Sequence, residues 1–166
     1  MDNTVKIDII TIGDKLPNWA NEAVFDYQKR FHSMADFSLS IKAIAPKKRT
    51  KTANISNIVA AESAALIAAI PNHYHAIALD VAGQQMSSEA LATQLDNYHS
   101  QGDNLAILIG GPDGFDDTVR QRVDGRWSVS RLTLPHPLVR VLIVETLYRS
   151  VSILHQHPYH RASTMR

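Results

Sequence analysis

The residues most suggestive of chemistry form a glycine turn, GGPDG at positions 110–114, which directly follows the apolar run 105–109. A glycine-rich turn at the end of a buried strand lets the backbone approach another group closely. Phosphate is not the expected group, because no lysine follows Gly114 and the glycines lack the G-x-G-x-x-G spacing of a dinucleotide site. The turn is therefore either a close approach to some other group or only a tight strand-to-helix connection, and these residues alone favour the connection.

A second candidate is the histidine-rich segment HQHPYHR at positions 155–161. His155, His157 and His160 are potential metal ligands, but no carboxylate or thiol accompanies them and a proline interrupts any helical face. We therefore predict no metal site. The chain has no cysteine, which excludes disulfides and thiol catalysis, and no G-x-S-x-G motif, so a serine hydrolase of that type is not expected either.

Positive charge is confined to the two flanks of the sequence. Residues 52–115 contain no lysine or arginine, whereas each flanking segment carries more basic than acidic residues. The densest cluster is PKKRTK, at positions 46–51. Such a distribution arises either from ordinary solvated charge or from a phosphate-binding surface built from both ends of the chain.

Alternating strands and helices must position these segments. Apolar runs and period-two alternation predict strands, and longer periodic segments with capping or breaking residues predict helices. This pattern predicts one α/β domain over residues 1–166, with a mostly parallel sheet and helices on both faces. Ligands bind such sheets at the carboxyl ends of strands. The expected strands are 5–13, 37–45, 75–83, 104–111 and 126–131, and the expected helices are 17–32, 53–70, 87–102, a short one after 115, and 136–156.

The sequence shows no membrane or export signal. No apolar run is long enough to cross a bilayer, and the first residues lack the basic region and small-residue cleavage site of a signal peptide. The absence of cysteine is compatible with a reducing compartment. We therefore expect a cytoplasmic protein with no membrane partner.

The last expected helix, 136–156, is apolar on nearly all sides. One sheet can cover only one side of it, so a second copy of the chain is the simplest cover, and we expect a homodimer with Val144 and Leu147 in its interface. Glu145 and Arg149 have the spacing and order of a favourable ion pair, and together with Arg140 they are expected to be paired or functional.

Four stretches together resemble one known family, the RlmH family. They are LIGGPDGF, ALDVAGQQMSSEALATQL, IGDKLPNWANEAVFDYQKRF and, most specifically, WSVSRLTLPHPLVRVLIVETLYRSVSILHQHPYHR. The resemblance implies a SPOUT-type α/β knot, with a C-terminal trefoil knot, working as a homodimer. It also implies an S-adenosylmethionine-dependent methyltransferase that modifies N3 of a pseudouridine in 23S (large-subunit) rRNA, with the assembled ribosome as the expected substrate. The knot follows from the resemblance alone.

The resemblance also implies roles for individual residues. Tyr159 is expected to stack on the target base, His160 to accept its proton and Arg161 to hold a carbonyl or phosphate, with Arg149 as a further catalytic candidate. Tight loops would offer backbone groups to the edges of the cofactor. The expected cofactor-binding residues are Leu79, Gly111, Ser130, Arg131, Leu132, Thr133, Leu134 and Pro135. The charge pattern adds an expected RNA-binding set, Lys47, Lys48, Arg49 and Lys51.

Two features depart from the family pattern. Residues 162–166 (ASTMR) extend beyond the usual end and are expected to form a mobile tail, and Arg131 occupies a variable position where its backbone matters more than its side chain. Two alternative functions fit the same sequence. One is a SPOUT methyltransferase acting on tRNA or another rRNA site, and the other is a non-catalytic ribosome-associated binding protein.

Overall fold

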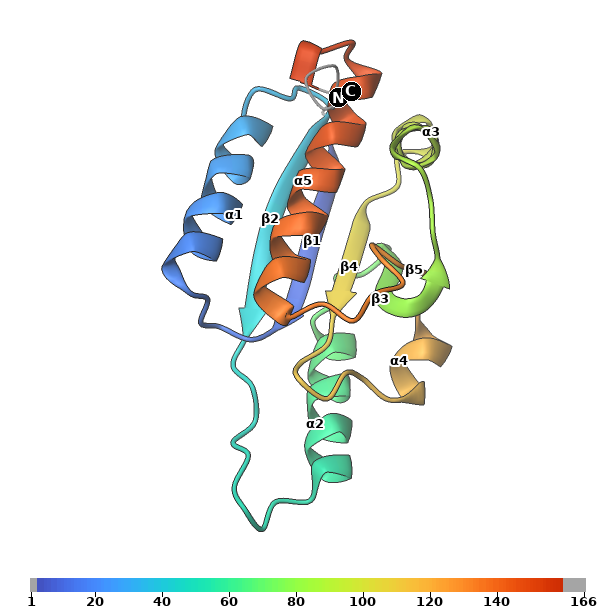
Figure 1. Cartoon of the computed structure of the whole chain (residues 1–166). Coiled ribbons are helices and arrows are strands. Elements are labelled where there is room, and N and C mark those ends of the chain that lie inside the picture. Colours follow the sequence, from blue (N-terminus) through green and yellow to red (C-terminus); the bar gives the residue numbers. More distant parts are fainter. Residues whose placement is uncertain (1–2, 160–166) are drawn as a thin grey trace.

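A computed structural model describes residues 3–159 and arranges them around a five-stranded parallel sheet of order β2-β1-β4-β3-β5 (Figure 1). All paired strands run parallel, which confirms the expected α/β class. The strands are β1 (Val5–Ile12), β2 (Phe37–Ile44), β3 (His75–Gln84), β4 (Leu105–Ile109) and β5 (Gly125–Trp127). The helices are α1 (Asn18–Phe31), α2 (Ile55–Ala68), α3 (Ser88–Gln101), α4 (Asp117–Arg122) and α5 (His136–Leu154).

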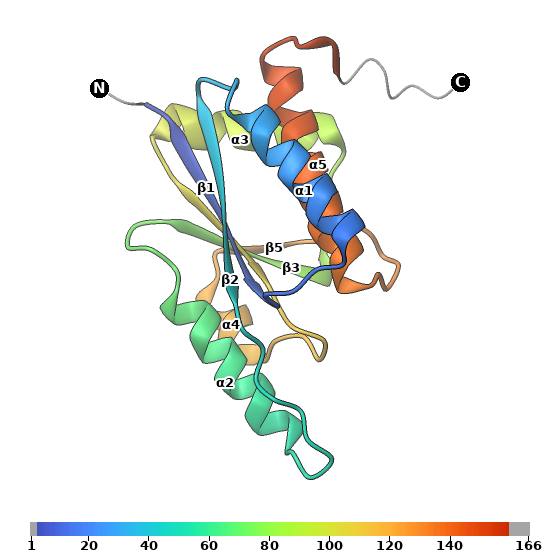
Figure 2. The ribbon, with the colours of Figure 1, turned by 90° about the vertical axis from the view of Figure 1, so that its left-hand side faces the viewer.

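Helices cover both faces of the sheet, as expected. Figure 2 shows α1 and α5 on one side and α2 and α4 on the other. Side chains of β1 alternate between two apolar clusters, with Ile7 and Ile9 facing the α5 side and Ile10 and Ile12 facing the α2 side. A strand buried on both faces has no polar face, which explains why β4 is a continuous apolar run and why β1 is mostly apolar.

The strand expected at 126–131 is shorter than predicted, because β5 ends at Trp127. Beyond it, local hydrogen bonds replace the sheet ladder. The Ser128 hydroxyl donates to the carbonyl oxygen of Ser130 (2.7 Å), and the Leu132 N–H donates to the Ser130 hydroxyl (3.0 Å). Serine side chains commonly compete with regular structure in this way. The result is an irregular loop, 128–135, that leads into α5.

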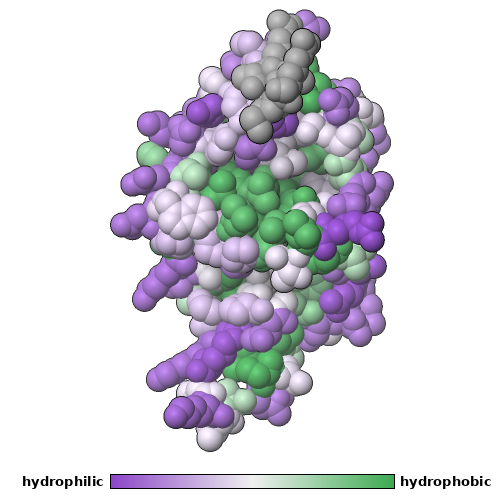
Figure 3. All heavy atoms as spheres, in the orientation of Figure 1, coloured by the Kyte–Doolittle hydropathy of each residue, from purple (hydrophilic) through white to green (hydrophobic). Residues whose placement is uncertain are grey.

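Helix α5 uses more of its apolar surface within the protomer than we expected. Val144 and Leu147 are fully buried in the cluster beneath the helix, so they face the sheet and do not lie in an interface with a partner. The outward side carries Leu138 and Leu142, which are half-buried and belong to neither apolar cluster. Figure 3 shows apolar residues gathered in the centre of the face that α5 occupies in Figure 1.

Candidate functional site

Three segments that are distant in the sequence meet around a cavity of about 220 Å³. They are residues 79–81 of β3, the glycine turn with its flanks (109–115) and the loop 128–134. Next to the cavity the register of β3 against β5 shifts between Leu79 and Gln84, and such irregularities are common beside functional sites. Of the residues expected to hold the cofactor, Leu79, Gly111, Ser130, Leu132, Thr133 and Leu134 line this cavity, whereas Arg131 and Pro135 belong to the same loop but do not line it.

The glycine turn is folded tightly upon itself. The Gly114 N–H donates to the Gly111 carbonyl (2.9 Å), and a Cβ placed on Gly110 would lie 2.8 Å from the carbonyl carbon of Gly114. A Cβ on Gly111 would meet Glu62 Oε1 and Ile12 Cγ2, both at 3.0 Å, on the side of α2. The sequence predicted that the missing Cβ of Gly111 lets a cofactor approach. In the structure the absent Cβ makes room for the packing beneath the turn, and contact between Gly111 and a cofactor stays a prediction.

Asp80 is a cavity residue that the sequence did not single out. It has an ion pair with Arg126 (2.9 Å) and a longer one with Arg120 (3.5 Å), and its other oxygen accepts from the Ala82 N–H. Burial alone would raise the pKa of Asp80, but these hydrogen bonds and charges outweigh burial and hold the pKa below its ordinary value. The cavity therefore contains one fixed carboxylate.

The start of α5 is fastened to the ends of β1 and β4. Arg140 is 4% exposed, and its Nη2 donates to the Gly13 carbonyl (2.7 Å) and the Thr11 hydroxyl (3.1 Å), while lying 2.9 Å from His136 Nε2. A proton on that ring nitrogen would face another donor. Burial, then the charge of Arg140, lowers the pKa of His136 against an opposing hydrogen bond with the Gly110 backbone. His136, which lines the cavity, is therefore a neutral imidazole at neutral pH.

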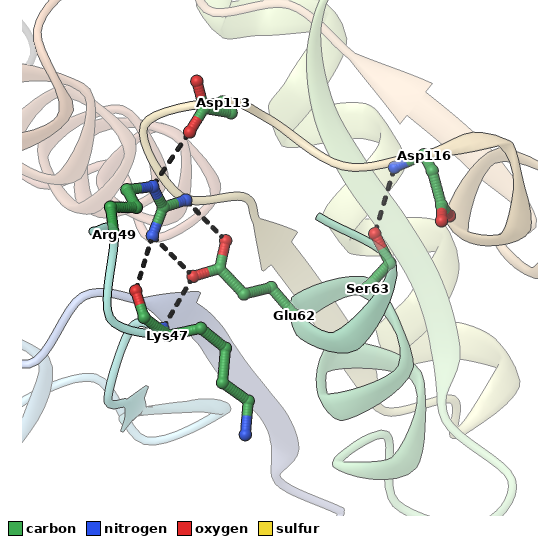
Figure 4. Close-up of polar contacts among 6 residues, drawn as sticks. All are labelled: Lys47, Arg49, Glu62, Ser63, Asp113 and Asp116. Atoms are coloured by element: carbon green, nitrogen blue, oxygen red, sulfur yellow. Dashed lines mark hydrogen bonds and ion pairs between the residues drawn. The ribbon is translucent and has the colours of Figure 1, made fainter. Parts of the chain in front are cut away.

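The basic loop, residues 45–54, follows β2 and runs beside α2, away from the sheet (Figure 1). Lys47, Lys48 and Lys51 are exposed on it. Arg49 is placed differently from our expectation, because its guanidinium contacts Glu62 and Asp113 and the Lys47 carbonyl (Figure 4). Three lysines of the expected RNA-binding set are thus accessible to an external partner, whereas the hydrogen-bond partners of Arg49 belong to the same chain.

The expected catalytic residues fall into two groups. Arg149 forms the predicted ion pair with Glu145, and its guanidinium lies 5.0 Å from the centre of the Tyr159 ring. The Tyr159 hydroxyl donates to Glu145 (3.1 Å) and lies 2.8 Å from the Tyr27 hydroxyl. Burial, these hydrogen bonds and the charge of Glu145 raise the pKa of Tyr159. Tyr159 is therefore a neutral phenol packed on α1 and α5.

The other expected catalytic residues, His160 and Arg161, lie outside the described residues, as does the 162–166 extension. Within residues 3–159, no three histidine, aspartate or glutamate side chains gather as metal ligands would. His155, from the histidine-rich segment, instead lies 3.1 Å from a carboxylate oxygen of Asp36. In this part of the chain no helix has the length and apolar character needed to traverse a bilayer.

Comparison with known proteins decides the family. Residues 5–160 match a family model described as "Predicted SPOUT methyltransferase". The chain belongs to the SPOUT methyltransferase family. Its curated relatives include proteins named "Ribosomal RNA large subunit methyltransferase H" from Chromohalobacter salexigens (43% identical over 157 residues, 95% of this chain and 100% of the relative) and Methylococcus capsulatus (40% over 157 residues, 95% and 100%). A protein of the same name from Legionella pneumophila strain Paris is 42% identical over 157 residues, covering 95% and 99%.

This match confirms the family expected from the sequence and makes the chain a methyltransferase. A methyltransferase needs a methyl donor, and the cavity is the candidate site for it. The residues assigned to donor binding, catalysis and RNA contact stay predictions, and so does the trefoil knot.

Proposed function

We propose that this SPOUT protein uses S-adenosylmethionine to methylate N3 of a pseudouridine in 23S, large-subunit rRNA. The names of its relatives support the substrate class, and the resemblance of its motifs to the RlmH family supports the base and the donor. The enzyme would act in the cytoplasm, where ribosomes are found, and the assembled ribosome is the proposed substrate.

The composition of the cavity is the single observation that carries the choice of donor. None of the described residues that line it is lysine or arginine, whereas Asp80 places a carboxylate in it. The cations beside this wall, Arg120 and Arg126, are already paired with Asp80, so a phosphate-bearing nucleotide would lack a free cationic partner among the lining residues. S-Adenosylmethionine has no phosphate, carries a positive sulfonium, and presents a flat adenine that suits apolar walls such as Leu79, Ile109 and Phe115.

The chain's own residues would mainly hold and orient the donor. Backbone groups of the glycine turn and of loop 128–135 would meet the edges of the adenine and the amino-acid part, with Asp80, held by Arg120 and Arg126, in the wall beside them. Bound S-adenosylmethionine supplies an electrophilic methyl group. Transfer forms a bond from N3 to the methyl carbon and breaks the sulfur–methyl bond, while the N3 proton leaves. Alignment of the reacting atoms is therefore the principal requirement on the loops.

Removal of the N3 proton is assigned to the C-terminal segment. We keep His160 as the proposed proton acceptor and Arg161 as the group that stabilises the developing negative charge on the base. Tyr159 would stack on the base only after leaving its contacts with Tyr27 and Glu145. Changing His160 or Arg161 to alanine should lower the single-turnover methylation rate even at saturating RNA. Full recovery of the rate at saturation would show that these residues only bind RNA.

RNA phosphates would contact the exposed lysines of the basic loop, Lys47, Lys48 and Lys51. Phosphate contacts orient the RNA without reading its sequence, so the cavity and the C-terminal segment would recognise the base. We further propose a homodimer through the outward side of α5, where Leu138 and Leu142 are only half-covered within the protomer.

The function is tested by the modification itself. Large subunits from cells lacking the protein should lack one methyl group on a 23S pseudouridine, and purified protein with S-adenosylmethionine should restore it, as read by mass spectrometry of nuclease fragments. If the deletion leaves 23S rRNA unchanged and alters a tRNA or another rRNA position, the alternative substrate is correct. If no RNA changes and the protein binds no S-adenosylmethionine, it is a binding protein.

A further inference from the structure

A buried acid on α2 connects the basic loop to the glycine turn. Glu62 is 1% exposed, and its carboxylate accepts from Arg49 Nη2 (2.8 Å), from Arg49 Nη1 (3.0 Å) and from the Lys47 N–H (2.9 Å). The third guanidinium donor, Nε, reaches Asp113 in the glycine turn at 2.9 Å. Figure 4 shows Arg49 between the helix and the turn, with its donors directed to both.

The same turn of α2 also holds the far end of the glycine segment. Ser63, fully buried beside Glu62, accepts through its hydroxyl oxygen from the Asp116 N–H at 3.0 Å. Glu62 Oε1 lies directly under the turn, where a Cβ on Gly111 would come within 3.0 Å of it. Helix α2 therefore fixes the glycine turn at Asp113, through Arg49, and at Asp116.

Geometry and charge suit Arg49 for this role better than a lysine would. A guanidinium presents donors in a rigid planar fork, so it can engage a carboxylate with two nitrogens and a second acid with the third. Glu62 and Asp113 hold the pKa of Arg49 above its ordinary value, so the group stays charged at every physiological pH. A buried carboxylate deprived of such a partner is costly, which makes the pair a stable connection.

We propose that Arg49 is a positioning residue that couples RNA binding to cofactor binding through Glu62 and Asp113. The inference rests on the proposed function of the cavity and the basic loop. The backbone N–H of Lys47 and the side chain of Arg49 share one carboxylate, so RNA that orders the backbone of the basic loop would also order the contact from Arg49 to the turn. Each ligand should therefore strengthen binding of the other by the same factor, as linkage requires.

The test compares calorimetric affinity for S-adenosylhomocysteine with and without large ribosomal subunits from cells lacking the protein. The unmodified protein should bind S-adenosylhomocysteine about fivefold more tightly when the subunits are present, the lower end of typical coupling. Asp113→Asn, which weakens the contact to Arg49 and leaves Glu62 in place, should reduce that factor below about twofold. Asp113→Glu, which keeps a carboxylate, should restore most of the coupling. Affinity for subunits alone should not change, because the lysines are intact.

Asp96→Asn is the matched control, since Asp96 is an exposed acid on α3, a helix that contributes no residue to the walls of the cavity. It should keep the full coupling. Arg49→Lys retains the charge but not the fork, so it should lose the coupling too. Equal coupling in the unmodified protein, Asp113→Asn and Arg49→Lys would overturn the inference and leave the proposed function standing. Failure of the unmodified protein to bind S-adenosylhomocysteine would overturn the proposed function as well.

Discussion

The glycine turn and the basic loop both follow the carboxyl end of a parallel strand, β4 and β2 respectively, yet they are built for different contacts. The turn lines a cavity whose described walls hold no lysine or arginine, and its shape depends on close backbone contacts such as Gly110 against Gly114. The basic loop exposes Lys47, Lys48 and Lys51 and lies outside the walls of that cavity. One region offers backbone and apolar surface, and the other offers exposed positive charge.

This difference suggests a division of labour. A cofactor that must be aligned to a fraction of an ångström is served by rigid, well-packed loops, whereas a large polyanion needs attraction over a longer range. Placing lysines in the cavity would also repel a sulfonium. The two regions are joined through Arg49, which belongs to the basic loop in sequence and to the support of the turn in space.

The largest expected effect concerns the outward side of α5, the proposed dimer interface. The oligomeric state decides whether the glycine turn and the basic loop of one protomer act alone or beside those of a second copy. Leu142→Asp places a charge on the half-buried outward surface, so the variant should sediment as a monomer at micromolar concentration, where the unmodified protein sediments as a dimer. Ile55→Asp, which alters an exposed apolar residue at the start of α2, should remain dimeric. A monomeric unmodified protein in analytical ultracentrifugation would exclude the dimer.

Gly110→Ala tests whether cofactor binding depends on the shape of the glycine turn. The added methyl group would meet the Gly114 backbone at 2.8 Å, so the turn must open. Affinity for S-adenosylmethionine should fall at least tenfold, about 1.4 kcal/mol, with RNA affinity in the absence of cofactor unchanged. Gly102→Ala, at the left-handed end of α3 with no atom within 4 Å, is the matched control and should affect only stability. Unchanged calorimetric affinity in Gly110→Ala would place the cofactor elsewhere.

The role of the basic loop in RNA binding is tested by changing Lys47, Lys48 and Lys51 together to glutamine. RNA affinity should weaken, and the slope of its logarithm against that of salt concentration should flatten by roughly 0.7–0.9 for each lysine–phosphate ion pair removed. Cofactor affinity should stay the same. A control that removes equal charge elsewhere, with Lys6, Lys15 and Lys29 changed to glutamine, should leave the slope nearly intact. An unaltered slope in the loop variant, measured by filter binding at several salt concentrations, would mean that the loop is only solvated surface.

The sequence predicted the fold better than the side-chain contacts that explain individual residues. Apolar periodicity predicted the parallel sheet, and the resemblance predicted that Leu79, Gly111 and Ser130 share one site, which agrees with the cavity that all three line. The sequence could not reveal that the Cβ position of Gly111 faces Glu62, because that contact joins segments about fifty residues apart. For the same reason Arg49 resembled its lysine neighbours. Its partners Glu62 and Asp113 become visible only when α2 and the turn are placed together.

Asp80 and α5 show two further limits. A single acid within a strand is a common pattern, and Asp80 is distinguished only by the register shift of β3 beside the cavity and by its pairing with Arg120 and Arg126. In α5, the apolar composition indicated more cover than one sheet can give, and α1 and α3 of the same chain supply part of that cover. The expected homodimer stays a prediction. Periodicity did not separate Val144, which is fully buried, from Leu142, which is half-buried. Helix composition reports how much surface is covered and does not say by what.

The smallest expected effect concerns pH and the support of the cavity. His136 has a lowered pKa in the folded protein, so its neutral form contributes stability that is fully present above the unfolded value of about 6.5. That contribution is lost as pH falls from there toward the folded pKa. The difference in free energy of unfolding between the unmodified protein and His136→Gln should therefore shrink on acidification, as measured by urea denaturation at several pH values. A difference that grew would contradict a neutral His136.

Hydrogen–deuterium exchange of backbone amides with each ligand in turn tests the division between the two regions most directly. S-Adenosylmethionine alone should protect residues 109–115 and 128–135, and large ribosomal subunits alone should protect residues 45–54. In the unmodified protein each ligand should also protect the other region more weakly, through Arg49. With Asp113→Asn, the two strong patterns should persist and this weaker protection should disappear. If S-adenosylmethionine protects the basic loop and leaves the glycine turn exchanging as before, the division proposed between the two regions is wrong.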